Sequence, residues 1–190
     1  MMPPVKPMLA RAIDELPEEE LALEPKWDGF RCIVYRDRDE VVLDSRNQKP
    51  FNRYFPELVE PLRRSLPDRC VVDGELIVEI DGRLDFDALG QRIHPAESRV
   101  NRLAERTPVS LVVFDVLAAN DTSLMATPFI ERRAVLETMA TGFEPPVHLA
   151  PMTRDRELAM EWFHTLEGAV VVVQPEDQRA DTITGLVQPI

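Results

Sequence analysis

Apolar residues in the first third of the chain predict a hairpin followed by a helix. Two apolar runs, at 32–35 and 41–43, flank the charged segment 36–40, which is the pattern of two strands joined by a turn. Apolar residues then recur at helical spacing over 55–66, with a proline at position 56, where the first turn of a helix tolerates it. We therefore expect a β-hairpin and then a helix.

The segment 70–82 carries two Asp-Gly pairs. Asp73-Gly74 lies between the apolar runs 70–72 and 76–78, and Asp81-Gly82 follows them. Asp-Gly is a frequent turn pair in hairpins. The pattern predicts a turn at each pair.

Helices and strands are interleaved in the second half. Asp85 is a candidate cap for a short helix, residues 111–114 predict a buried strand, and helices are expected to begin at Thr127-Pro128 and at Thr153. The last helix is followed by an apolar strand, 169–173. The residues expected to face the core from that helix are Leu158, Trp162, Phe163 and Leu166, with Gly168 as its stop. The predicted class is α+β, with mainly antiparallel sheets flanked by helices.

Composition supports a folded, soluble chain. Of 190 residues, 44% are hydrophobic and 29% are charged. The sequence has no run of roughly 18 apolar residues, which a membrane helix needs, and its start lacks a signal-peptide core, so we expect a cytoplasmic protein with no membrane partner. Cys32 and Cys70 form no disulfide framework and are expected to be small buried core residues.

The charge is acidic and unevenly distributed. The net charge is −12, and residues 136–190 hold 9 acidic but only 3 basic residues. This balance argues against an extended basic surface for nucleic acid, although a local basic face is compatible with it. Only three of the 22 basic residues are lysines, at positions 6, 26 and 49, so no lysine follows Lys49.

Residues 24–31, Glu-Pro-Lys-Trp-Asp-Gly-Phe-Arg, carry the densest candidate chemistry. Lys26 is either a solvated residue in a turn or a nucleophile. A nucleophile requires a lysine pKa well below the ordinary value of about 10.4, which burial or a neighbouring cation achieves. Trp27 and Phe30 would supply the burial and Arg31 the positive charge. These residues alone leave both alternatives open.

Lys26-Trp27-Asp28-Gly29-Phe30-Arg31 resembles the K-x-D-G-x-R signature of the covalent nucleotidyltransferases, which include ATP-dependent DNA ligases, RNA ligases and mRNA capping enzymes. Three further motifs of the family follow in order. Two more segments resemble short bacterial DNA ligases in particular. The three motifs are Ser45-Arg46-Asn47, Asp73-Gly74-Glu75 and Phe114-Asp115, and the two segments are Phe55-Pro56-Glu57-Leu58 and Arg92-Ile93-His94-Pro95-Ala96. The resemblance runs from about residue 3 to residue 168.

The resemblance implies a nucleotidyltransferase fold and a catalytic lysine. Lys26 would attack the α-phosphate of ATP, release pyrophosphate and hold AMP covalently. The AMP would then pass to the 5′-phosphate of nicked DNA, the expected partner, in DNA repair or recombination. Magnesium is the implied metal.

The resemblance also implies the nucleotide contacts. Glu24 would lie near the adenine, while Arg31 and Arg46 would contact ribose or phosphate. Glu75 would hold the ribose hydroxyls or the Mg²⁺ ion, and Phe114 would stack on the adenine. Taken singly, Arg46 is equally a solvated turn residue and Phe114 an ordinary core residue.

Two family motifs that bring lysines to the ATP phosphates are not matched. Residues 167–172 fit E-G-x-x-x-K except that Val172 stands at the lysine position. Alternatively, Glu167-Gly168-Ala169 resembles a segment that short bacterial ligases carry at a helix end just upstream, and the motif itself is missing. Either alignment leaves no lysine, and no segment fits K-x-K. We expect an adenylation domain over 1–173 whose fold is incomplete at its C-terminal end, an irregular or divergent tail over 174–190, and no OB-fold domain.

Three functional hypotheses follow. The first is a truncated DNA ligase adenylation domain that is weak or inactive alone, because each missing phosphate contact is typically worth about 10²–10³ in rate. The second is a noncatalytic nucleotide- or protein-binding module that retains the fold. The third is a half-enzyme completed by a separate partner chain that supplies the missing motifs.

Overall fold

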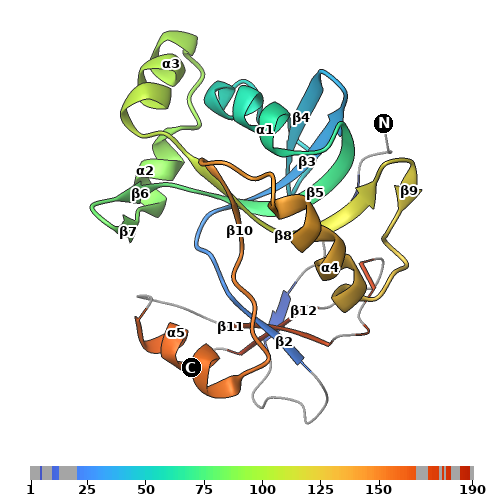
Figure 1. Ribbon diagram of the computed structural model, residues 1–190. Coiled ribbons are helices and arrows are strands. Elements are labelled where there is room, and N and C mark those ends of the chain that lie inside the picture. The colour runs from blue at the N-terminus through green and yellow to red at the C-terminus, as the bar shows by residue number, and fades with distance from the viewer. Residues whose placement is uncertain are drawn as a thin grey trace.

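Two sheets form the framework, and within residues 21–165 two connecting segments join them (Figure 1). The computed structural model describes residues 5, 10–12, 21–165, 171–175, 177, 179–180 and 185–188. The larger sheet lies in the upper part of Figure 1 with most of the helices, and the smaller sheet lies below it beside α5. The connections run from β2 to β3 and from β10 to α5.

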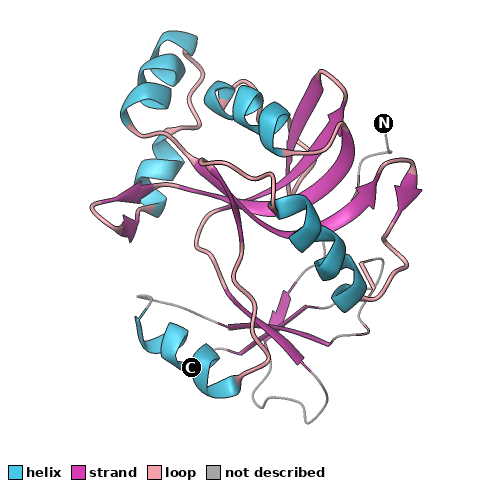
Figure 2. Ribbon diagram, viewed as in Figure 1, coloured by secondary structure: helices cyan, strands magenta, loops and turns pink. Residues whose placement is uncertain are grey.

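The larger sheet is mainly antiparallel. Its strands have the order β10-β8-β5-β3-β4, with β9 also beside β8, and β10 is parallel to β8. The mixed strand and helix order, visible in Figure 2, confirms the predicted α+β class. The strands are β3 (Phe30–Asp37), β4 (Glu40–Ser45), β5 (Arg69–Ile77), β8 (Ser110–Ala119), β9 (Thr122–Ser123) and β10 (Val147–Leu149).

The predicted first hairpin is confirmed as β3 and β4. Asp37 pairs with Glu40, and Arg38 in the turn between them has φ 56°. The predicted turn at Asp81-Gly82 is also confirmed, since both residues have positive φ and join the short strands β6 (Glu79–Ile80) and β7 (Arg83–Leu84).

The predicted turn at Asp73-Gly74 is wrong, because both residues lie inside the continuous strand β5. Gly74 is required there for a different reason. A Cβ atom at Gly74 would lie 2.6 Å from the carbonyl oxygen of Val112 on β8. The glycine therefore permits close approach of two strands, one of the positional roles of glycine in a sheet.

The helices pack their apolar residues against the larger sheet. The predicted helix over 55–66 is present as η1 and α1, and Asp85 caps α2 by accepting a hydrogen bond from the Ala88 amide at 2.8 Å. Helix α3 was not predicted, because Val100 is its only buried residue. The helices are η1 (Pro56–Leu58), α1 (Val59–Ser65), α2 (Phe86–Gln91), α3 (Glu97–Arg106) and α4 (Phe129–Ala140).

The main core lies between these helices and the larger sheet. Leu58 and Leu62 from the helical side pack with Val34 and Leu43 of the sheet, and all four are fully buried. Cys32 and Cys70 are buried in the same core, as predicted, and burial raises the pKa of the Cys70 thiol to about 12. In the part of the chain that the structure describes, no helix combines the length and the apolar character that crossing a membrane requires.

The smaller sheet has the order β1-β12-β11-β2. Strand β12 lies in the segment predicted to be an irregular tail, so that prediction is wrong for residues 185–188, and β11 extends past residue 173. Ala169, Val170 and Gly168, which the sequence assigned to a strand and a helix stop, lie outside the described residues. The strands are β1 (Ala10–Ala12), β2 (Leu21–Pro25), β11 (Val171–Pro175) and β12 (Gly185–Gln188).

Helix α5 (Arg156–Thr165) packs against β2 and begins later than predicted. Thr153 instead forms a bridge with Leu23, with backbone hydrogen bonds of 2.8 and 2.9 Å in both directions. Asp155 accepts hydrogen bonds from the Glu157 and Leu158 amides in the first turn. Leu158 is 38% exposed, so its predicted core position is wrong.

Candidate functional site

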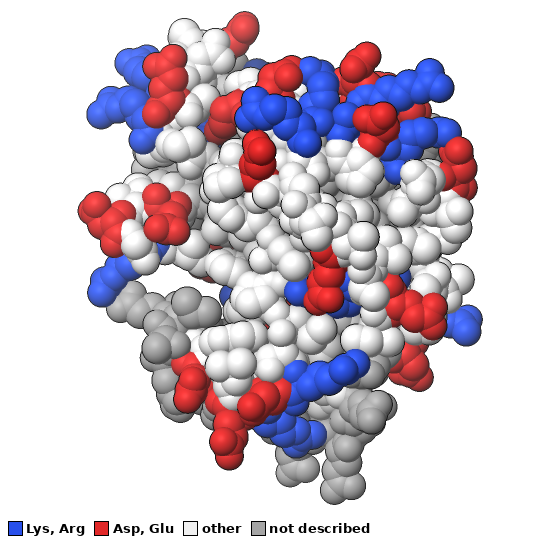
Figure 3. Space-filling view, viewed as in Figure 1, with Lys and Arg blue, Asp and Glu red and all other residues white. Residues whose placement is uncertain are grey.

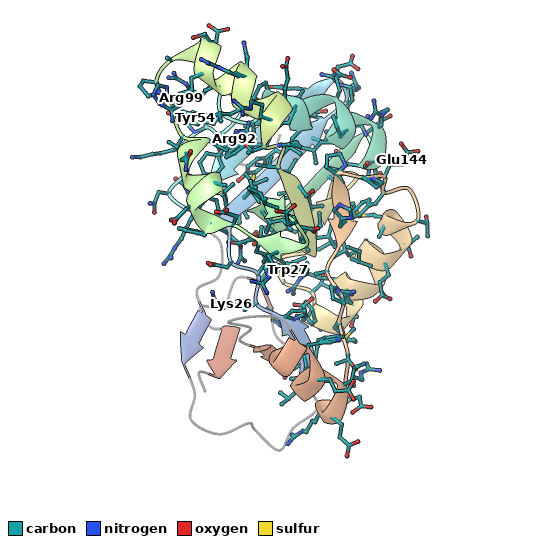
Figure 4. The ribbon with its side chains drawn as sticks, turned by 90° about the vertical axis from the view of Figure 1, so that its left-hand side faces the viewer. Lys26, Trp27, Tyr54, Arg92, Arg99 and Glu144 are labelled. Carbon is teal, nitrogen blue, oxygen red and sulfur yellow. The ribbon has the colours of Figure 1, made fainter. Side chains whose placement is uncertain are left out.

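The loop between β2 and β3 carries Lys26 across the junction of the two sheets. In Figure 4, Lys26 and Trp27 lie between the larger sheet above and the smaller sheet below. Lys26 and Asp28 are exposed, whereas Trp27 and Phe30 are partly buried. Lys26 therefore faces solvent, while the rings of Trp27 and Phe30 face the protein.

The two aromatic residues anchor the loop on separate clusters. Trp27 packs with Phe114 against a small buried cluster, while Phe30 contacts Phe51 and Phe86, with ring centroids 6.1 and 5.4 Å away. The expectation that Trp27 and Phe30 bury Lys26 is therefore wrong: they fix the backbone on either side of an exposed lysine. The buried members of the Trp27 cluster are Ile77, Val112 and Ala150.

Gly29 allows the loop to lie directly on β5. A Cβ atom at this position would collide with the carbonyl oxygen of Leu76 and would lie 2.8 Å from the side chain of Glu75. No larger residue fits without moving the backbone. The glycine thus sets the short distance between the Lys26 loop and the Glu75 side chain.

Arg31, at the start of β3, is held in a defined orientation. Its guanidinium donates two hydrogen bonds to the Asp73 carboxylate, at 2.5 and 2.6 Å, and lies 4.4 Å from the centre of the Phe114 ring. Burial by itself would lower the pKa of Arg31, but Asp73, Glu75 and Asp115 outweigh it and raise the pKa. Arg31 is therefore a fixed cation.

Asp73 is a site residue that the sequence reasoning did not assign. It is buried, and its side chain is 3% exposed against 25% for Arg31. The available signal was its place in the Asp73-Gly74-Glu75 motif, where only the glutamate was given a role. The structure gives Asp73 the role of orienting Arg31.

Phe114 is the extra residue of a β-bulge. On β8, Val113 lies opposite Gly74 and Asp115 lies opposite Asp73, so Phe114 has no partner on β5. A bulge of this kind redirects a side chain. Here it brings the Phe114 ring to both Arg31 and the Trp27 cluster.

Glu75 lies opposite Arg31 in the β3–β5 ladder. Burial, above all, raises the pKa of Glu75 to about 7, while Arg31 and Lys26 lower it and Asp73 and Asp28 raise it. The influence of Lys26 means that the ammonium group lies within electrostatic range of this carboxylate. Among the described residues, no group of three or more His, Cys, Asp and Glu side chains is arranged to hold a metal ion.

Glu24, two residues before Lys26, is buried in β2. It accepts a hydrogen bond from Arg133 of α4 at 3.0 Å, and both side chains are 4% exposed. Sequence reasoning did not identify Arg133, which is 109 positions away and gave no local signal. The pair links the smaller sheet to a helix of the larger one.

Arg46 is exposed in the turn that follows β4. Ser45 lies opposite Cys32, which brings the next residue, Arg46, to the end of the sheet where Arg31 begins β3. Glu24, Arg31, Glu75 and Phe114 thus gather around the Lys26 loop, with Arg46 at the edge of the sheet beside them.

The predicted position for a phosphate-binding lysine is also at this junction. Val172 of β11 pairs with Glu24 of β2. Glu167 and Gly168, which begin the imperfect motif, lie outside the described residues. The residue opposite Glu24 is therefore a valine, at the position that one of the two alignments assigns to the lysine.

Relatives of known family match most of this chain. A family described as "ATP dependent DNA ligase domain" matches residues 4–171. DNA ligase C of Mycobacterium tuberculosis is 52% identical over 173 residues, which cover 89% of this chain and 48% of that protein. DNA ligase C2 of Mycolicibacterium smegmatis is 49% identical over 180 residues, which cover 93% and 51%. The chain spans about half the length of these curated relatives.

The fold is also found in a solved ligase structure. A mycobacterial DNA ligase D in complex with ATP and MES superposes with a TM-score of 0.72 at 25% identity, over 96% of this chain and 59% of that one. This is the adenylation, or nucleotidyltransferase, fold of DNA ligases. Since the family match also covers most of the sequence, the chain belongs to the ATP-dependent DNA ligase domain family.

Proposed function

We propose that Lys26 is the nucleophile of an ATP-dependent adenylation reaction that serves DNA nick sealing. The Lys26 amine forms a bond to the α-phosphate of ATP as pyrophosphate leaves, and the AMP then passes to a 5′-phosphate in nicked DNA. The observation that carries the proposal is an exposed lysine on a loop anchored at both ends, beside Glu75 and a fixed Arg31. Such anchoring holds a nucleophile in place.

The nucleotide contacts follow from the side chains around the loop. Arg31 and Arg46 bind ribose or phosphate, Glu24 lies near the adenine, and Phe114 stacks on the base. Arg31 lies over the Phe114 ring and would therefore be close to the stacked base. Trp27 adds a buried indole N–H that has no hydrogen-bond partner among the described residues, and a bound nucleotide would supply one.

Glu75 is the residue proposed to hold Mg²⁺ or the ribose hydroxyls. Magnesium in nucleotide sites is commonly bound through one or two carboxylates, water and the substrate phosphates, so a single carboxylate is sufficient. The raised pKa fits this role, because a cation stabilises the ionised form that burial disfavours. When bound, the ion would neutralise phosphate charge.

We further propose that this chain by itself adenylates slowly and does not seal nicks. No lysine follows Lys49, and Val172 stands opposite Glu24 in the strand that would carry one. Losing phosphate contacts of this type costs about 10²–10³ in rate for each. Figure 3 shows acidic side chains interspersed with the basic ones over the visible face, which suits a weak grip on DNA.

Incubation with α-labelled ATP and Mg²⁺ tests the proposal. A labelled adduct in the wild type that is absent in Lys26→Arg supports it. ATP binding without an adduct, under conditions in which a full-length ligase is labelled, would favour a noncatalytic nucleotide-binding module. An adduct that forms only with a second polypeptide would favour a half-enzyme completed in trans. Efficient closure of a nicked duplex by the purified chain would contradict the proposed lack of sealing.

A further inference from the structure

Two adjacent arginines of α4 bind acidic residues in different sheets. Arg132 donates two hydrogen bonds of 2.8 Å to Asp115 of β8, in the larger sheet. Arg133 donates to Glu24 of β2, in the smaller sheet, at 3.0 Å. The side chains of the two arginines are 0% and 4% exposed, so both pairs are shielded from water. One turn of helix therefore connects the two sheets.

Each acidic partner either belongs to the proposed adenine site or is next in sequence to a residue that does. Glu24 is itself the proposed adenine contact, and Asp115 directly follows Phe114, the proposed stacking residue. Because Phe114 lies in a bulge, the direction of its side chain depends on how β8 is held at this point. Arg132 holds β8 there through Asp115. The two arginines thus support the two sides of the same proposed pocket.

Arg133 also binds the second connection between the sheets. Its guanidinium donates to the Ala150 carbonyl at 2.8 Å, and the Ala150 amide donates to Val113 of β8, also at 2.8 Å. Ala150 belongs to the cluster against which Trp27 and Phe114 pack. Arg133 is therefore linked at once to Glu24 and to the cluster that carries Phe114.

Only an arginine fits these contacts. Its planar fork donates in several fixed directions, whereas a lysine is a single point charge on a flexible stem. A carboxylate such as Glu24 accepts hydrogen bonds, so it favours the exocyclic amino group of adenine over the carbonyl oxygen that guanine presents at the equivalent position. This selection depends on where the carboxylate is held.

We infer that Arg133 is a positioning residue that sets Glu24 relative to Phe114 and thereby determines the preference for adenine over guanine. The inference rests on the proposed function, because that function supplies the nucleotide. Arg133 itself acts through Glu24 and touches no substrate.

The test compares Arg133→Lys with Arg92→Lys. Arg92 is equally buried and binds Glu57, the Thr107 carbonyl and the Tyr54 carbonyl, away from Lys26 in Figure 4. Equilibrium affinities for ATP and for GTP are measured by calorimetry on the folded full chain, together with the melting temperature. Arg133→Lys is expected to weaken ATP binding about tenfold and GTP binding much less, whereas Arg92→Lys lowers the melting temperature and leaves both affinities unchanged.

Outcomes separate this inference from the proposed function. Wild-type ATP affinity that is retained in folded Arg133→Lys, with the same ratio to GTP, overturns the inference alone. Failure of the wild type to bind ATP overturns the proposed function and the inference with it. If Arg133→Lys does not fold, the double variant Glu24→Gln/Arg133→Gln, which keeps a neutral hydrogen bond, is expected to fold and to lose the preference for ATP. Retention of the preference in that variant also overturns the inference.

Discussion

Arg31 and Arg92 are both held by carboxylates, but in regions of different character. Arg92 is completely buried, and its contacts with Glu57 and two carbonyl groups join the end of α2 to η1 and to the end of α3. Arg31 has a quarter of its side chain exposed and lies on an aromatic ring beside the Lys26 loop. Both belong to segments that resemble DNA ligases. The comparison shows that segments resembling the family can serve different purposes. Around Arg92 such a segment holds the fold together, and around Arg31 it forms a candidate chemical site.

Lys26→Ala is expected to separate the two regions most strongly. Removing the nucleophile should reduce the AMP adduct by at least ~10³-fold, because no other side chain replaces it. Since Lys26 is exposed, the melting temperature should stay close to that of the wild type. Labelling with α-labelled ATP and a thermal melt measure the two quantities. An adduct of normal yield in this variant would place the nucleophile elsewhere.

Arg92→Met is expected to lower stability and to leave ATP binding unchanged. It leaves the Glu57 carboxylate without its cation and two carbonyl groups without a donor, which costs about 3–5 kcal/mol of stability for a buried pair. ATP affinity should not change in protein that remains folded. Urea unfolding gives the stability, and calorimetry gives the affinity. A loss of ATP affinity at unchanged stability would show that this region also serves the nucleotide.

Asp73→Asn is expected to lower both stability and ATP affinity. Arg31 loses a charged partner and its fixed orientation, so stability should fall by about 2 kcal/mol, less than for a fully buried pair because Arg31 is partly exposed. ATP affinity should fall about tenfold for the same reason. Asp68→Asn is the matched control, since Asp68 pairs with Arg36 at an exposed position. Equal effects of the two variants on ATP binding would remove the proposed role of Asp73.

Among the variants that alter stability, Glu75→Gln is expected to have the smallest effect on it, and one that depends on pH. A carboxyl group whose pKa is raised from 4.5 to about 7 on folding binds its proton more tightly in the folded state. Its presence therefore costs stability as pH rises through this range, and the full cost is present above pH 7. The free energy of unfolding of Glu75→Gln should exceed that of the wild type by roughly 1–2 kcal/mol at pH 8, and this difference should be absent at pH 4.

Melting curves of the variant and the wild type between pH 4 and 8 measure this difference. Glu79→Gln, at an exposed position of β6, is the control. A constant offset of Glu75→Gln at all pH values would contradict the assigned pKa.

The sequence was sufficient where neighbouring residues determine the structure. The first hairpin, the cap at Asp85 and the turn at Asp81-Gly82 all depend on residues within a few positions of one another. The ordered motifs likewise indicated which side chains gather near Lys26. Asp73-Gly74 has the same local signature as Asp81-Gly82, but Gly74 serves the approach of β8, which lies far away in the sequence.

Contacts between distant segments were beyond the sequence pattern. Arg133 reaches Glu24 across 109 positions, and β12 is a strand because β1 and β11 lie on either side of it. The sequence left the exposure of Lys26 open, because two aromatic neighbours are compatible with burial until their separate anchoring clusters are known. Each error came from judging a residue by its neighbours in sequence when its neighbours in space decide its role.

Because of the bulge at Phe114, the number of residues in β8 decides which face of the sheet each side chain takes. Successive residues of a regular strand face opposite sides of the sheet, but the extra residue lets Phe114 contact Arg31 while Asp115, next in sequence, faces Asp73 across the ladder. Replacing Phe114 would remove a ring, whereas deleting it would restore the regular alternation and reassign the faces of the residues around it. In this stretch of β8, a one-residue deletion is therefore a larger change than loss of the Phe114 ring alone.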